Sequence, residues 1–226
     1  MSYSKDIIKD NKKLTIFCDN ENDHIYKHIC YYKNKPVFYE NNLLEKISSF
    51  NITGTYVDCG ANIGNHSLYF LNFSNADKVI SIEGHPDVFN ILKLNIETNI
   101  NDKNKYLLLP YLVGEKNCSD KYISLTDNNN CGVAEVNNNK IGFNIPMITI
   151  DELNISDLTL IKLDVENYEY NVLLGAENSI KKFHPIIIIE LHKTNPNYDN
   201  IIKFLQKYKY KTDAISYAHS PTFIYM

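Results

Sequence analysis

Thr55-Tyr-Val-Asp-Cys-Gly-Ala-Asn-Ile-Gly-Asn-His-Ser-Leu-Tyr69 is the stretch of sequence that decides the fold. Apolar and β-branched residues lead into Asp58, a turn flanked by Gly60 and Gly64 follows, and a helix-forming run comes next. A strand that turns in this way into a helix leaves free backbone N–H groups at the helix start, and the glycines let a ligand approach the main chain. The stretch therefore predicts a nucleotide-like cofactor at the carboxyl end of a strand in an open α/β sheet. An ordinary strand-to-helix turn would have the same outline.

The residues of this turn discriminate between classes of cofactor. A dinucleotide site has the pattern G-x-G-x-x-G, whose middle glycine makes room for a pyrophosphate, and Asn62 stands where that glycine would be. Asp58 would repel a pyrophosphate, but it suits a cofactor that has a positive sulfonium and an ammonium group. S-adenosylmethionine is such a cofactor, so the residues favour it over NAD.

Composition and charge narrow the classes of function. The chain has 226 residues, of which 44% are hydrophobic and 22% charged, as in a soluble globular protein with a sizeable core. The net charge is −4 and every basic residue is Lys, which argues against nucleic acid as a partner. The five cysteines contain no C-x-x-C pair, which argues against a disulfide framework or a zinc site. There is neither an apolar signal core nor an apolar run of membrane-spanning length, so we expect a cytoplasmic protein.

Strands and helices alternate after the turn. We expect a first helix at 63–71, a short helix from 149 to 153, and further helices at 86–100, 168–183 and 198–208. We expect strands at 56–57, 78–83, 106–113, 158–163 and 186–191, and a closing antiparallel pair at 212–217 and 222–225. This order predicts a doubly wound, mostly parallel sheet of seven strands with an antiparallel edge.

Two segments lie outside this alternation. Residues 1–50 predict a small N-terminal extension, with short strands at 14–18 and 25–32 and a helix at 41–50 that packs on the domain of residues 51–226. We expect the two parts to form one compact unit. Residues 114–147 are rich in Asn and have weak strand signals at 121–125 and 141–145. They predict a hairpin-like excursion over the site.

Acidic residues follow several of the expected strands. Glu83 ends the strand at 78–83, 25 residues after Asp58, where an acid would meet the ribose hydroxyls of a cofactor. Lys162, Asp164 and Glu166 share one face if their segment is extended, and so do Glu190 and His192. Because neighbouring parallel strands end at the same edge of a sheet, we expect Asp164, Glu166, Glu190 and His192 to converge beside the cofactor's methyl group. A purely structural ion-pair network around Lys162 is the alternative.

Methyl transfer to an alcohol requires removal of the hydroxyl proton, and two mechanisms fit these residues. In the first, His192 or a carboxylate with a raised pKa acts as the general base. In the second, Asp164 and Glu190 hold Mg²⁺, which lowers the pKa of the hydroxyl. The sequence leaves both mechanisms open.

The assembled pattern resembles the FkbM family of S-adenosylmethionine-dependent methyltransferases. Residues 57–65, with Asn62 in place of the middle glycine, are similar to the first motif of that family, and residues 160–169, 172–176 and 185–190 are similar to its second signature. Residues 39–40 and 148–153 are similar to weaker features. Asn167 stands where the family commonly has Gly, and Asn tolerates the left-handed backbone better than most residues do. The resemblance covers roughly residues 39–192 and implies O-methylation of a hydroxyl on a sugar, a glycan-like molecule or a polyketide.

The expected protein is thus a class I (Rossmann-like) methyltransferase that uses S-adenosylmethionine to methylate a hydroxyl of a sugar or glycan precursor, as in surface polysaccharide biosynthesis. The alternatives are methylation of another small molecule, a protein or a nucleic acid, and a cofactor-binding subunit without catalysis. The oligomeric state stays open, a homodimer included. The expected catalytic residues are Lys162, Asp164, Glu166, Glu190 and His192, with Asp164 and Glu190 also the candidate metal ligands. The expected cofactor-binding residues are Asp58, Gly60, Ala61, Asn62, Gly64, Asn65, Glu83, Gly84 and Val113.

Overall fold

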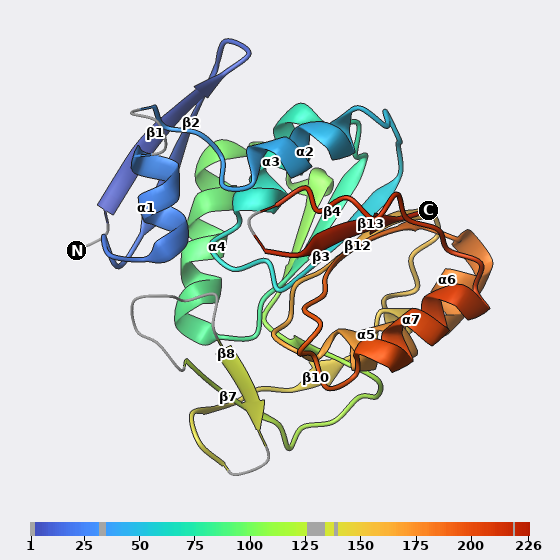
Figure 1. Cartoon of the computed structure of the whole chain (residues 1–226). Coiled ribbons are helices and arrows are strands. Elements are labelled where there is room, and N and C mark those ends of the chain that lie inside the picture. The colour runs from blue at the N-terminus through green and yellow to red at the C-terminus, as the bar shows by residue number, and fades with distance from the viewer. Residues whose placement is uncertain (1–2, 32–34, 126–133, 138–139, 219) are drawn as a thin grey trace.

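A six-stranded sheet forms the centre of the molecule (Figure 1). The computed structural model describes residues 3–31, 35–125, 134–137, 140–218 and 220–226. The strand order is β13-β12-β11-β3-β4-β5, and every neighbouring pair is parallel except β12 with β13. The strands are β3 (Thr55–Cys59), β4 (Lys78–Ile82), β5 (Tyr106–Leu109), β11 (Leu158–Leu163), β12 (Ile186–Glu190) and β13 (Thr222–Tyr225). The mostly parallel sheet with an antiparallel edge is therefore confirmed.

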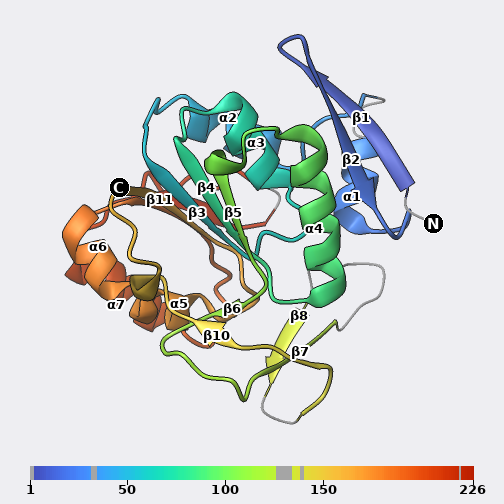
Figure 2. The same cartoon turned by 180° about the vertical axis from the view of Figure 1, so that it is seen from behind.

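Helices cover both faces of this sheet (Figures 1 and 2). One group consists of α2 (Asn41–Ser48), α3 (Asn65–Phe73) and α4 (Pro86–Asn99), and the other of α5 (Glu169–Gly175), α6 (Glu177–Phe183) and α7 (Tyr198–Lys207). Successive strand residues point to opposite faces, so Tyr56 and Leu160 belong to one apolar core while Val57 and Ile161 belong to the other. Burial on both faces explains why these strands are almost continuously apolar.

The expectation of a seventh strand at 212–217 is wrong, since these residues form no strand. The carboxylate of Asp213 accepts hydrogen bonds from the backbone N–H of Ile215 and the hydroxyl of Tyr217. Ala214, between them, has a left-handed backbone with φ of 60°. Local side-chain bonds of this kind compete with strand pairing, so β13 closes the sheet alone.

The N-terminal region differs in part from the expectation. Strands β1 (Tyr3–Lys9) and β2 (Lys12–Cys18) form a hairpin whose two turn residues, Asp10 and Asn11, both have positive φ. The segment expected as a strand at 25–32 is instead helix α1 (His24–Tyr31). The Asp23 carboxylate caps this helix by accepting a 2.9 Å bond from the N–H of Tyr26. The domain boundary expected at residue 50 stays a prediction.

Two expected elements are divided. The strand expected at 106–113 separates at Pro110, which has no N–H to donate, into β5 and β6 (Leu112–Val113). The helix expected at 168–183 separates at Ala176, whose φ is −111°, into α5 and α6. Two short 3₁₀ helices, η2 (Lys103–Lys105) and η3 (Asp151–Leu153), precede β5 and β11.

The excursion after β6 forms a small sheet of its own beside the main one (Figure 1). Its strands are β7 (Tyr122–Leu125), β8 (Ala134–Asn137) and β9 (Phe143–Asn144), all antiparallel, and β10 (Met147–Ile148) then returns to pair with β6. The expected hairpin-like excursion is present in these residues, while 126–133 and 138–139 lie outside the described part. Within the described ranges, no helix combines the length and apolar character that crossing a membrane requires.

Candidate active site

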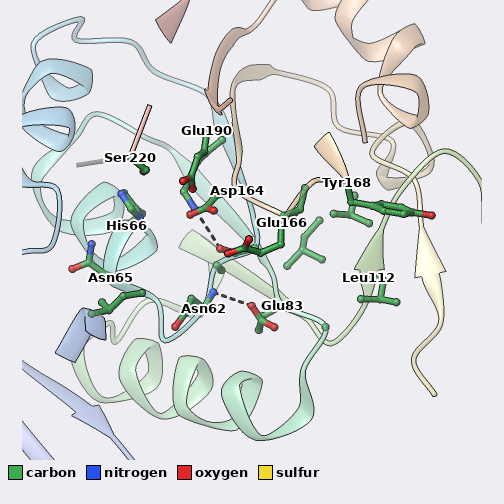
Figure 3. A pocket seen from close by; sticks show the side chains of 18 of the residues that line it. Asn62, Asn65, His66, Glu83, Leu112, Asp164, Glu166, Tyr168, Glu190 and Ser220 are labelled. Atoms are coloured by element: carbon green, nitrogen blue, oxygen red, sulfur yellow. Dashed lines mark hydrogen bonds and ion pairs between the residues drawn. The ribbon is translucent and has the colours of Figure 1, made fainter. Parts of the chain in front are cut away.

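A cavity of about 340 Å³ opens at the carboxyl ends of the central strands. The structure brings most of the expected residues to its wall, and Figure 3 shows several of them facing one another. Asp58 and Gly64 do not line it. The expected residues that do are Gly60, Ala61, Asn62, Asn65, Glu83, Gly84, Val113, Lys162, Asp164, Glu166, Glu190 and His192.

The turn after β3 is fixed by close backbone packing. Gly60 has φ of 73°, and a Cβ there would lie 1.9 Å from the carbonyl oxygen of Asp164. Only glycine fits where β3 and β11 approach so closely. Gly64, with φ of 90°, precedes α3 and packs toward Leu92 rather than the cavity. Gly64 therefore starts the helix without lining the cavity, and its predicted contact with a cofactor stays a prediction.

Glu83 is held rigidly at the end of β4. Its Oε2 accepts a 3.0 Å bond from the N–H of Asn62, and its Oε1 accepts a 2.8 Å bond from the N–H of His85. Burial raises the pKa of this carboxyl to about 7, against the lowering effect of the two backbone bonds. The carboxylate thus presents its remaining lone pairs to the cavity in one orientation, as a receptor for hydroxyl groups would.

Asp58 and Lys162 form a buried ion pair beneath the cavity. The Asp58 Oδ1 lies 3.2 Å from Lys162 Nζ, and its Oδ2 accepts a 2.6 Å bond from the Ser67 hydroxyl. Lys162 also donates to the carbonyl of Gly60 at 3.2 Å. Burial alone would lower the pKa of Lys162, but the charges of Asp58 and Asp164 raise it. Lys162 is therefore a fixed cation that ties β11 to the turn, and it cannot accept a proton.

Asp164, Glu190 and His192 form a chain of contacts along the cavity wall. Burial favours the neutral form of Asp164, yet the Lys162 ammonium, 3.3 Å from its Oδ2, lowers its pKa overall. Burial, reinforced by the charge of Asp164, raises the pKa of Glu190 to about 9. Glu190 is therefore protonated at neutral pH and hydrogen-bonds to ionised Asp164. Its Oε1 lies 2.9 Å from His192 Nε2.

These contacts define the state of the exposed imidazole of His192. A protonated Glu190 uses its proton toward Asp164, so its Oε1 accepts the N–H of His192 Nε2. In the tautomer whose Nε2 carries the proton, Nδ1 is the ring atom with the free lone pair.

A second recess of about 280 Å³ adjoins the cavity and shares Glu166, Glu190 and His192 with it. Its other lining residues are Asn167, Glu169, Thr194 and Asn195. Glu166 and Asn167 both have left-handed backbones, with φ of 49° and 69°, which confirms that Asn167 adopts the conformation for which Gly is favoured. Burial raises the pKa of Glu166 to about 7.

The Glu169 carboxylate supports this turn from below. It accepts the N–H groups of Val165 and Asn167 at 3.3 and 3.2 Å, and the side-chain amide of Asn195 at 2.8 Å. All the residues that line the recess have polar side chains, namely carboxylates, amides, a hydroxyl and an imidazole.

Sequence reasoning missed a further pair at the opposite end of the cavity. Glu40 and His66 are both buried, and Glu40 Oε2 lies 3.1 Å from His66 Nε2. In the sequence, residues 39–40 stand out only through the family resemblance. Glu40 and His66 are 26 residues apart, with α2 and β3 between them, so their contact arises from tertiary packing and no local pattern indicates it.

A model of the methyltransferase FkbM domain matches residues 58–212. This chain belongs to the FkbM methyltransferase family. The resemblance stated from the two motifs is therefore confirmed, and methyl transfer is the class of reaction that membership implies. The match does not include Glu40 or Ser220, although both line the cavity of this FkbM methyltransferase.

The chain is similar to several solved structures. The FkbM methyltransferase from Methylobacillus flagellatus KT matches with a TM-score of 0.56 and 19% identity over 90% of this chain and 48% of that one. A tRNA (uracil-54, C5)-methyltransferase from Pyrococcus abyssi, in complex with S-adenosyl-L-homocysteine, matches with a TM-score of 0.49 and 12% identity, over 99% of this chain and 44% of that one. Precorrin-6y C5,15-methyltransferase from Geobacter metallireducens GS-15 matches with a TM-score of 0.46 and 11% identity, over 81% and 84%. This chain spans about half the length of the Methylobacillus protein, and no curated protein matches it.

The candidate metal ligands of this FkbM methyltransferase do not fit Mg²⁺. Asp164 faces the Lys162 ammonium at 3.3 Å and is therefore already paired with a cation. A hard divalent cation needs several ionised or carbonyl oxygens, and it would have to displace a buried, permanently charged lysine. No group of three or more His, Cys, Asp or Glu side chains suited to a metal occurs among the described residues.

Proposed function

We propose that this FkbM methyltransferase uses S-adenosylmethionine to methylate a hydroxyl of a sugar or glycan precursor. The observation that supports this proposal most is that the side chains lining one continuous cavity change from apolar at one end to polar at the other (Figure 3). Leu112 and Tyr168 make one end apolar, Glu83 lies in the middle, and Asn65 and His66 make the other end polar. A molecule with a flat apolar base, a diol and a charged tail has the same order of groups.

The residues present fit the cofactor at each of these places. The apolar end, to which Val113 and Ile123 also belong, suits adenine, and the carboxylate of Glu83 suits the ribose hydroxyls. Glu40 and Asp164 provide negative charge for a sulfonium and an ammonium group. Asp58 contributes through Lys162, whose position it fixes. When bound, S-adenosylmethionine supplies an electrophilic methyl group on a positively charged sulfur.

His192 is the general base in this proposal. Its Nδ1 accepts the proton of the acceptor hydroxyl while its Nε2–H stays on Glu190 Oε1. The imidazolium that forms is stabilised by the negative charge of Asp164, which lies on the other side of Glu190. Glu190 therefore acts as a neutral link between the two and does not remove the proton itself.

The recess beside His192 suggests the class of acceptor. Its carboxylates, amides and hydroxyl are groups that hydrogen-bond to a polyol. A chain without Arg, with acids at the mouth of its site, is poorly suited to a phosphate backbone. We therefore favour carbohydrate over nucleic acid or protein as the acceptor, in a pathway such as surface polysaccharide biosynthesis. A cytoplasmic location is part of the proposal, since the described cysteines, Cys18, Cys30, Cys59 and Cys118, are free thiols.

One experiment tests the cofactor and the acceptor class together. The purified protein is incubated with isotope-labelled S-adenosylmethionine and separate pools of nucleotide sugars, glycans, RNA and protein, and labelled products are identified by mass spectrometry. Label on a carbohydrate oxygen is the expected result. Label on RNA or protein alone would refute the acceptor class. Absence of S-adenosylmethionine binding in calorimetry would refute the cofactor.

A further inference from the structure

Glu40 lies at the polar end of the cavity in an unusual conformation. It precedes α2 with φ of 56° and ψ of 35°, the left-handed region that residues with a Cβ rarely adopt. Its side chain makes no capping bond to the helix it precedes and is instead buried, with 6% exposed, in the cavity wall. The fold thus holds a carboxylate in the cavity at the expense of a favourable helix cap.

The segment that holds Glu40 is tied to the start of α3. The N–H of Tyr39 donates to Asn65 Oδ1 at 2.9 Å, and the amide of Asn65 donates to the carbonyl of Tyr39 at 3.0 Å. These two bonds join residue 39 to the helix that begins directly after the cofactor turn. The position of Glu40 relative to that turn is therefore fixed by bonds between the Tyr39 backbone and the Asn65 side chain.

The carboxylate of Glu40 retains capacity for a further partner. Its Oε2 lies 3.1 Å from His66 Nε2, and its Oε1 accepts a long bond of 3.5 Å from the Ser220 hydroxyl. Among the described residues, no Lys forms an ion pair with it, because Lys162 is engaged by Asp58 and Asp164. A carboxylate has about four lone-pair sites, so Glu40 can accept hydrogen bonds from a cationic ligand without losing these contacts.

We infer that Glu40 binds the α-ammonium group at the amino-acid end of the cofactor, with His66 as a positioning residue. The inference rests on the proposed function. In Figure 3, Leu112 and Tyr168 lie on one side of Glu83, and Asn65, His66 and Ser220 lie on the other. If adenine occupies the apolar side and the ribose meets Glu83, the amino-acid tail extends toward His66 and hence toward Glu40. Asp164, the other acid on the cavity wall, lies 3.3 Å from the Lys162 ammonium, whereas Glu40 has no lysine at ion-pair distance among the described residues.

Calorimetric titration with two neutral-sulfur ligands isolates this contact. S-adenosylhomocysteine has the amino-acid tail, whereas 5′-methylthioadenosine has the same base, ribose and sulfur without it. Glu40→Gln should weaken S-adenosylhomocysteine binding about 10- to 100-fold, as expected for loss of a charge-assisted hydrogen bond, and leave 5′-methylthioadenosine binding unchanged. His66→Gln should produce a smaller loss with the same selectivity. The matched control is Glu45→Gln, which removes the same charge from an exposed position of α2 and should affect neither ligand.

The outcomes separate the two proposals. Equal weakening of both ligands by Glu40→Gln, or no change in either, would overturn the role of Glu40 while leaving the cofactor site intact. If the wild-type protein binds neither ligand nor S-adenosylmethionine, the proposed function fails and this inference fails with it.

If the Glu40→Gln variant does not fold, the same contact can be tested by changing the ligand instead of the protein. The wild-type protein should then bind an S-adenosylhomocysteine analogue that lacks the α-amino group about 10- to 100-fold more weakly than S-adenosylhomocysteine itself. Equal affinity for the two would overturn the inference.

Discussion

His192 Nε2 lies 2.9 Å from Glu190 Oε1, and Glu190 in turn hydrogen-bonds to Asp164, so a surface imidazole is joined to the buried carboxylate that faces Lys162. The exposed end of this chain of contacts is the end that an acceptor can reach. The buried end is fixed by the same lysine that holds the turn after β3. In the proposed mechanism, proton removal and cofactor placement are thus connected through Lys162.

Replacement of His192 should reduce catalysis and spare cofactor binding. The side chain is half exposed beside the acceptor recess, so His192→Gln removes a base without opening the core. We expect kcat to fall about 10²- to 10⁴-fold while S-adenosylhomocysteine affinity in calorimetry stays within twofold, roughly the scatter of surface substitutions. Lys193→Gln, at the exposed neighbouring position, serves as the control. Wild-type kcat in His192→Gln would show that another group is the base.

Glu190→Gln distinguishes a neutral link from a carboxylate base. Gln can donate to Asp164 and accept from His192, as protonated Glu190 does, so the variant should retain most of its activity. Loss of activity comparable to that of His192→Gln would show instead that Glu190 removes the proton.

The same variant should change the pH dependence of stability. Folding raises the pKa of Glu190 from 4.5 to about 9. The favourable contribution of Glu190 to the free energy of unfolding is therefore complete below pH 4.5 and is lost as the pH rises through about 9. The free energy of unfolding of Glu190→Gln should therefore increase relative to wild type between these limits and level off above them. Urea denaturation at a series of pH values measures this difference, and a difference independent of pH would contradict the assignment.

Removal of the Lys162 charge should destabilise the fold strongly. Lys162→Met leaves the carboxylates of Asp58 and Asp164 without their cation, and Asp58 is fully buried. Breaking a buried pair in this way costs about 3–5 kcal/mol. Denaturant titration should show this loss, and the double variant Asp58→Asn/Lys162→Met should recover part of it. Additive effects of the two substitutions would mean that the pair does not interact.

Chelation should leave the activity unchanged. Asp164 faces an ammonium group and Glu190 is neutral, so this pair gives Mg²⁺ no suitable set of ligands. Initial rates with and without EDTA measure the effect, with a known metal-dependent methyltransferase as the positive control. Loss of activity that Mg²⁺ restores would reinstate the metal mechanism.

The central part of the fold could be predicted because its signals are local. The strands at 55–59, 78–82, 158–163 and 186–190 are short apolar runs that end in charged or turn residues, which any reading of periodicity detects. The apolar residues of helix α1 suit either a helical or a strand period, and the cap that Asp23 provides favours the helix. The strand expected at 212–217 failed for a similar reason, since the side chain of Asp213 competes with pairing.

Only those residues of the candidate site that lie at the ends of strands could be predicted from the sequence. The spacing placed Glu83, Asp164, Glu190 and His192 at one edge of the sheet, where they are found. The same spacing could not show that the Asp58 side chain points at Lys162 beneath the cavity. Glu40 and Ser220 come from segments that reach the cavity through long-range packing, which no local pattern encodes.

The polar end of the cavity is assembled from opposite regions of the chain. Glu40 comes before the first strand of the main sheet, and Ser220 directly precedes β13, the last one, yet their side chains share a hydrogen bond across 180 residues. A growing polypeptide would therefore complete the cofactor turn well before it could close the cavity around a ligand. The wall of the cavity is thus complete only once the segment that carries Ser220 packs against Glu40.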